Sequence, residues 1–163
     1  DYWCAAPTKV RKALPESIHL IWSDAFLWGD VAICGTRLWD SPEYEFGRFI
    51  EMKKPVKEDK PPKPQEDTQS IFQREVMRLG VALNAMDKTA RLKIAMVHYP
   101  PISADLKDST VSKMLENAGV AICVFGHLHS VRPGSELFGT KNGIAYHYVA
   151  CDWLGFSLRK IAD

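Results

Sequence analysis

The sequence lacks the features that mark several large classes of protein. Its longest uninterrupted apolar run covers residues 120–125 and is far too short to cross a bilayer. It shows no basic start followed by an apolar stretch and a small-residue cleavage site, the pattern of a secretory signal peptide. Neither sign of charge is in excess, because 21 Lys and Arg face 20 Asp and Glu, a net charge of +1. A basic surface for nucleic acid or for an anionic membrane is therefore not predicted.

Cysteine is also sparse, with four residues and no Cys-x-x-Cys pair. This spacing argues against a zinc ribbon and against a dense disulfide framework. Cys34 and Cys123 lie within apolar, strand-like runs, which predicts buried free thiols. Free thiols are typical of a reducing compartment, so we expect a cytoplasmic protein.

The length and composition are those of one folded domain, or most of one. The chain has 163 residues, of which 46% are hydrophobic and 25% charged, so disorder of the whole chain is excluded. It begins Asp-Tyr-Trp-Cys without an initiator methionine. We expect residues 1–163 to form a single domain that is incomplete at its N-terminal side, because the chain is processed, excerpted or without its front half.

The pattern of apolar residues predicts an α/β fold with a mixed sheet. Two fully apolar strands, over residues 93–99 and 120–125, flank a helix over residues 109–118, an arrangement typical of a parallel βαβ unit. An antiparallel hairpin is predicted around Gly29-Asp30. A second is predicted around Asn142-Gly143, between strands over residues 136–139 and 144–150. The other expected elements are helices over residues 8–14 and 68–86 and strands over residues 17–22 and 156–161.

Residues 51–67 differ from the rest of the chain, since they contain many charges, four prolines and almost no apolar side chain. Such a stretch cannot bury enough surface to offset the entropy of ordering it. We interpret it as a mobile surface insertion; a functional lid is the alternative.

Three histidines follow the two strands of the βαβ unit. His98 comes after the first strand, and His127 and His129 come after the second. Because parallel strands end at the same edge of a sheet, all three imidazoles are expected there, where open α/β sheets bind their ligands. Neutral imidazole is a ligand for zinc, iron and manganese, so the pattern predicts a metal site. The alternative for any one histidine is a structural or solvated side chain, which is the interpretation we give to His19 and His147.

Three imidazoles do not complete a hydrolytic two-metal centre, which also needs anionic ligands. The aspartates are candidates, but none has obvious ligand spacing; they are Asp1, Asp24, Asp30, Asp40, Asp105, Asp108 and Asp152. The residues alone therefore indicate part of a metal site.

Two motifs resemble the carboxyl-terminal half of the calcineurin-like metallophosphoesterases. They are Val-His-Tyr-Pro-Pro at residues 97–101 and Phe-Gly-His-Leu-His at residues 125–129. The loop at residues 35–40 and the helix with Arg-Glu at 74–75 and Arg-Leu at 78–79 are similar to segments of a bacterial branch of that family. The first three residues look like those that follow Gly-Asn-His in the family's Gly-Asn-His-Asp motif.

The resemblance implies a two-layer β-sandwich flanked by helices, here its second half, and hydrolysis of phosphate mono- or diesters. It implies two divalent ions (Mn, Fe or Zn), with His98 and His127 on one and His129 on the other, that hold the phosphate and activate water for in-line attack. By the same resemblance Asp1 orients a histidine that this chain lacks. Arg37 would reach a substrate phosphate, with a surface salt bridge as the alternative.

The chain departs from the family in having no Asp-x-His, no Gly-Asp-x-x-Asp and no Gly-Asn-His. The missing ligands would belong to an N-terminal half or to a partner chain. Two other interpretations stay open: a degenerate, non-catalytic module that serves as a protein-binding scaffold, and a mononuclear three-histidine site with other chemistry.

Overall fold

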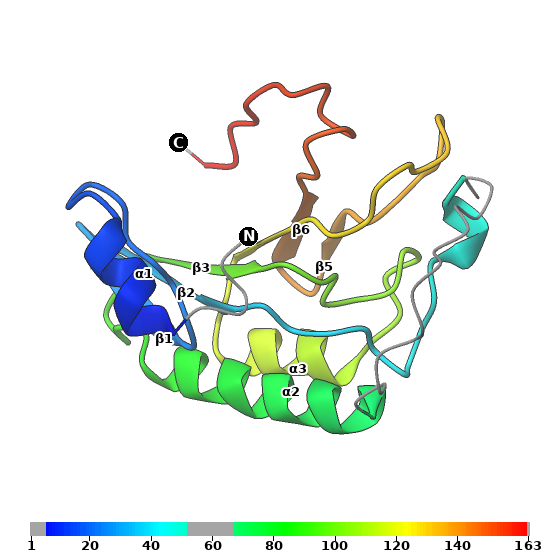
Figure 1. Cartoon of the computed structure of the whole chain (residues 1–163). Helices are drawn as coiled ribbons and strands as arrows, with labels where there is room; N and C mark the ends of the chain where they lie inside the picture. The colour runs from blue at the N-terminus through cyan, green and yellow to red at the C-terminus, as the bar shows by residue number, and fades with distance from the viewer. Residues whose placement is uncertain (1–5, 52–66, 163) are drawn as a thin grey trace.

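The computed structural model describes residues 6–51 and 67–162, which form a mixed six-stranded sheet with three α-helices (Figure 1). The chain is therefore an α/β protein, as predicted. In chain order the elements are α1 (Pro7–Ala13), β1 (Asp24–Trp28), β2 (Val31–Thr36), a 3-10 turn (Gly47–Phe49), α2 (Thr68–Asn84), β3 (Leu92–Val97), α3 (Thr110–Asn117), β4 (Ile122–Phe125), β5 (Thr140–Lys141) and β6 (Ile144–Tyr148).

The strand order is β1-β2-β3-β4-β6-β5. The four central strands, β2, β3, β4 and β6, are parallel, and the two edge strands are antiparallel to their neighbours. Both predicted hairpins are confirmed. Gly29 has φ 58° between β1 and β2, and Asn142 and Gly143 have φ 48° and 81° between β5 and β6, as a type I′ turn requires. The carboxyl ends of all four central strands consequently meet at one edge of the sheet.

Helices α2 and α3 lie side by side on one face of the sheet, and the segment after β6 lies on the other side (Figure 1). The Asp67 side chain caps α2 by accepting a hydrogen bond from the Gln69 N–H (3.1 Å). Ser109 and Ser112 form a reciprocal capping box at the start of α3. The apolar faces of both helices pack on the sheet, and the core includes Leu38, Leu79, Leu115, Phe125 and Ile144.

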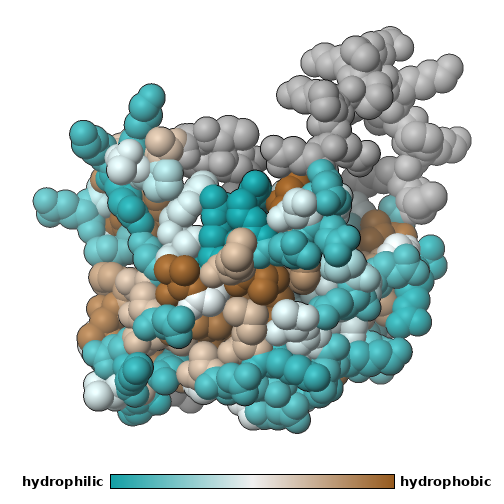
Figure 2. All heavy atoms as spheres, turned by 90° about the horizontal axis from the view of Figure 1, so that it is seen from below, coloured by the Kyte–Doolittle hydropathy of each residue, from teal (hydrophilic) through white to brown (hydrophobic). Residues whose placement is uncertain are grey.

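The outer side of the helix layer is partly apolar. Figure 2 shows apolar side chains gathered across this face between hydrophilic ones, and Met77 and Val81 of α2 are exposed. Cys34 and Cys123 are buried and free, as predicted, and burial raises the pKa of the Cys34 thiol to about 12. None of the helices within the described ranges has the length and apolar character that a bilayer crossing requires.

Three predicted strands are wrong. Residues 136–139 form no ladder, because the strand before the Asn142-Gly143 turn is β5 (Thr140–Lys141). Residues 17–22 leave the sheet because Ser23 takes a left-handed backbone (φ 59°) and Asp24 Oδ1 accepts a hydrogen bond from the Trp22 N–H. Residues 156–161 form no ladder, and Phe156 and Leu158 point their side chains to solvent.

The two-layer β-sandwich expected from the resemblance is not seen among the described residues. The described strands make one sheet, so the second sheet of the expected sandwich is not among them. Residues 52–66 of the expected insertion, and Asp1, lie outside the described residues.

Candidate metal site

His98 directly follows β3 and is anchored through its backbone to both neighbouring strands. The N–H groups of His98 and Tyr99 both donate to the carbonyl oxygen of Arg37 (3.1 Å each), which follows β2. The His98 carbonyl oxygen accepts from the N–H of Gly126 (3.1 Å), which follows β4. These bonds join the carboxyl ends of three parallel strands around one histidine.

His127 follows Gly126 and meets His98. Its Nδ1 lies 3.2 Å from His98 Nε2, and its ring packs against Tyr99 with centroids 3.8 Å apart. Two imidazole nitrogens bound to one ion at about 2.0–2.1 Å are themselves roughly 3.0–3.4 Å apart, so this spacing suits a shared ion. His127 has φ 69°, a left-handed conformation uncommon for a residue with a side chain and concentrated at functional sites.

His129 belongs to the same electrostatic group. Burial lowers the pKa of His98, and the neighbouring His127 and His129 lower it further. Burial also lowers the pKa of His127, as does His129, while Asp40 acts in the opposite direction. The lowered pKa values of His98 and His127 favour the neutral imidazole, which is the form that binds metals. The structure thus places His98 and His127 in contact, as the sequence predicts, and His129 acts on both through its charge while its own ligand atoms lie beside Cys151 and Asp152.

Leu128, between the two histidines of the loop, is buried, and its carbonyl oxygen accepts a hydrogen bond from the Tyr148 hydroxyl at the end of β6. The loop is therefore held on the sheet, with the His127 imidazole partly buried against Tyr99 and the His129 imidazole exposed.

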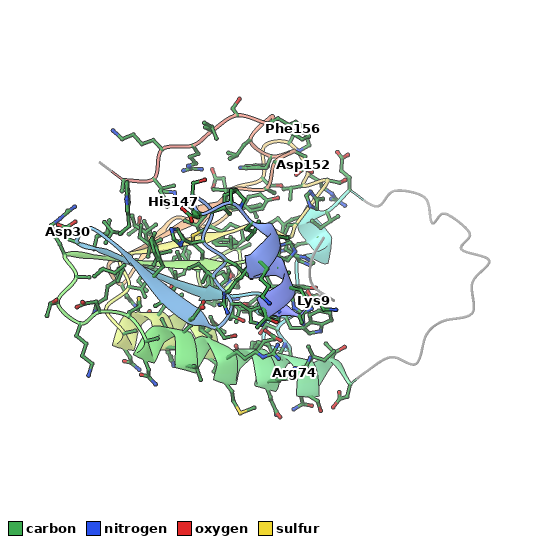
Figure 3. The ribbon with its side chains drawn as sticks, turned by 60° about the vertical axis from the view of Figure 1, so that its left-hand side comes forward. Lys9, Asp30, Arg74, His147, Asp152 and Phe156 are labelled. Atoms are coloured by element: carbon green, nitrogen blue, oxygen red, sulfur yellow. The ribbon has the colours of Figure 1, made fainter. Side chains whose placement is uncertain are left out.

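Two aspartates face these imidazoles. Asp40 Oδ1 lies 3.7 Å from His127 Nε2, and Asp152 Oδ1 lies 3.0 Å from His129 Nδ1. The other Asp152 oxygen accepts from the Ser130 N–H (2.9 Å), a bond that lowers the pKa of this carboxyl together with His129. Figure 3 shows Asp152 in the segment after β6, on the side of the sheet away from α2.

Sequence reasoning did not single out Asp40 and Asp152, although a signal for both was available. Asp40 follows the end of β2 at Thr36 by four residues, and Asp152 follows the end of β6 at Tyr148 by four. Each parallel strand of the sheet is therefore followed, within four residues, by a histidine of the candidate site or by an aspartate that pairs with such a histidine.

Cys151 is a further donor that the sequence analysis did not predict. Ligand atoms of His129, Cys151 and Asp152 all lie within 4.8 Å of one another, and all three residues are exposed. The donor chemistry of the whole site, imidazole with carboxylate and one thiol, fits a transition-metal ion. In the described part of the chain, Asp40 pairs with His127 and Asp152 with His129, so a two-ion centre would need a bridging ligand beyond these pairs.

The guanidinium of Arg37 faces Glu75, and its charge also contributes to the lowered pKa of His98. Its Nη2 lies 3.4 Å from Glu75 Oε1 of α2, and the guanidinium packs over the ring of Trp39 (4.5 Å). The predicted salt bridge exists, with a buried partner instead of one on the surface. A contact of Arg37 with substrate stays a prediction.

Comparisons with models of known protein families, with curated proteins and with solved structures gave no match for this chain. The resemblance to metallophosphoesterases therefore stays a prediction drawn from the two histidine motifs.

Proposed function

We propose that the chain carries part of the active site of a metal-dependent phosphoesterase that hydrolyses phosphate mono- or diesters. The observation that supports this proposal is the approach of His98 Nε2 and His127 Nδ1 to 3.2 Å at the carboxyl edge of the sheet. His129 and its Asp152 partner lie in the same loop cluster. The corresponding fold is the second half of a calcineurin-like metallophosphoesterase sandwich, and the free buried thiols favour a cytoplasmic location.

Each imidazole has a defined task in this proposal. His98 Nε2 and His127 Nδ1 would hold one ion, with the remaining proton of His127 on Nε2, which lies 3.7 Å from Asp40 Oδ1. Asp152 accepts the Nδ1 proton of His129, which fixes the tautomer and leaves Nε2 for a metal, as carboxylate–histidine–metal triads do. Divalent ions bound there (Mn, Fe or Zn) would neutralise charge on the phosphate oxygens and lower the pKa of the attacking water. The bridging carboxylate and the acid for the leaving oxygen would come from an N-terminal half or a partner chain.

The test is metal content and hydrolysis of an aryl phosphate by the full-length protein. We expect His127→Ala to lose bound metal and to lower the rate by at least about 100-fold, because metal ligands act as a unit. His147→Ala is the matched control, since it removes an imidazole from β6 that faces none of these groups in the contacts of the described residues. Equal metal content in wild type and His127→Ala would refute the site.

A protein-binding scaffold is the second candidate, and exposed apolar side chains on the strands favour it. Trp28 of β1 and Met96 of β3 are exposed although both lie in the sheet. Aryl phosphate hydrolysis by the wild type above the His127→Ala background would exclude a purely non-catalytic module.

A further inference from the structure

A cavity of about 930 Å³ lies between α1, α2 and the ends of β2 and β3. Much of its wall is apolar, with contributions from Leu14, Ile18, Ile21, Trp22, Ile71 and Met96. Figure 3 shows α1, which carries Lys9, above the part of α2 that carries Arg74. His98 also lines the cavity, so it opens beside the candidate metal site.

One end of this cavity is strongly polar. Glu75 is 1% exposed, and its Oε2 accepts a hydrogen bond from the Thr36 hydroxyl (3.1 Å). Its Oε1 faces three guanidinium groups, with Arg78 Nη1 at 2.7 Å, Arg37 Nη2 at 3.4 Å and Arg74 Nε at 3.8 Å. Three cations therefore share one oxygen atom of one carboxylate.

The positive charge at this end exceeds what Glu75 neutralises. Among the described residues that line the cavity, Glu75 is the one acid, and Arg74 with Arg78 already outnumber it. These two arginines are one helical turn apart, so they repel each other. Their side chains are 46% and 41% exposed, which leaves guanidinium N–H groups available to a ligand that enters the cavity. A planar guanidinium fork is well suited to phosphate and carboxylate oxygens.

We propose that this cavity binds an amphipathic organic anion, with its phosphate or carboxylate group at Arg74 and Arg78 and its apolar part against the wall formed by Ile18, Ile71 and Met96. The binding itself needs no metal. The further step, that this anion is the phosphate-ester substrate, rests on the proposed function and on the place of His98 in the same wall.

The experiment is calorimetric titration of the full-length protein with octyl phosphate in the presence of EDTA, which removes the metal from the measurement. Octyl glucoside serves as the neutral probe and inorganic phosphate as the head group alone. We expect octyl phosphate to bind at least about tenfold more tightly than either, because only this probe uses both ends of the cavity. Arg74→Gln should weaken its binding about tenfold, since Arg74 is the arginine least engaged with Glu75. Lys88→Gln, which removes an exposed charge from the turn after α2, is the matched control and should bind like wild type.

A second measurement does not depend on any variant: binding by the wild type should weaken as salt rises from about 0.05 M to about 0.5 M. Arg74→Lys should restore part of the affinity. Equal binding of octyl glucoside, no binding of octyl phosphate, or wild-type affinity in Arg74→Gln would overturn the proposal. Each of these results leaves the metal content of the wild type and of His127→Ala unchanged, so failure here is distinguishable from failure of the metal site.

Discussion

Replacement of Glu75 by glutamine tests the most buried charge of the described residues. The variant keeps the shape of the side chain and its acceptor for the Thr36 hydroxyl, but it leaves Arg37 and Arg78 without the carboxylate that faces them. Removing one partner of a fully buried ion pair costs about 3–5 kcal/mol. Because Arg37 and Arg78 are 22% and 41% exposed, water replaces part of the lost interaction, and we expect a loss of about 2 kcal/mol.

The free energy of unfolding is measured by urea denaturation, with thermal unfolding as a second readout. A loss of about 2 kcal/mol corresponds to a fall in Tm of roughly 4–8 °C for a chain of this size. Glu45→Gln, at an exposed glutamate, is the matched control and should stay within about 0.5 kcal/mol of wild type. A loss below about 0.5 kcal/mol for Glu75→Gln would refute the reasoning, as would the absence of coupling in a double-mutant cycle with Arg78→Met.

Three other substitutions test separate parts of the molecule. Asp152→Asn removes the charged acceptor for His129 Nδ1, so Zn²⁺ affinity measured by calorimetry should fall about tenfold or more; unchanged affinity would contradict the assigned orientation. Gly35→Ala would place a Cβ 1.9 Å from the carbonyl oxygen of Met96, so urea unfolding should show a loss of about 3 kcal/mol, whereas a neutral effect would contradict the β2–β3 register. Hydrogen bonds from a neighbouring serine hydroxyl and a lysine lower the pKa of Asp105 from 3.8 to about 2. Because the folded pKa lies below the unfolded one, this stabilisation is present above about pH 4 and is lost as the pH falls toward 2; the stability difference between wild type and Asp105→Asn should vanish over that window, and a constant difference would contradict it.

The elements that could be predicted from the sequence are those whose signals are local. Each of these signals specifies a conformation over a few residues. They are the apolar stripe of α2, the capping side chains of Asp67 and Ser109, and the Asn142-Gly143 turn. A strand is different, because alternation supplies one face but not the partner that completes the ladder. Residues 17–22 alternate well, yet the backbone turn at Ser23 takes them out of the sheet.

The candidate site also contains residues that could be predicted and residues that could not. The contact of His98 with His127 could be predicted because topology alone brings the ends of parallel strands to one edge. The partners of these imidazoles depend on loop conformations that no short motif encodes. Asp40 reaches His127 only through the course of the segment after β2, and Asp152 reaches His129 only through the turn after β6.

Arg37 connects the two regions that carry the proposals. Its carbonyl oxygen holds the backbone N–H of His98, and its guanidinium faces Glu75 at the polar end of the cavity. A change in the position of Glu75 would therefore shift Arg37 and, through the backbone hydrogen bond, His98. A ligand anion bound to Arg74 would compete with Glu75 for this guanidinium. If the cavity and the histidine site serve one reaction, Glu75→Gln should lower metal retention and tighten octyl phosphate binding, because it removes the negative charge beside Arg74 and Arg78. Arg74→Gln should weaken octyl phosphate binding alone. Metal retention at the wild-type level in Glu75→Gln would show that the two sites are energetically independent, and the arginine cluster would then act in ligand binding without positioning His98.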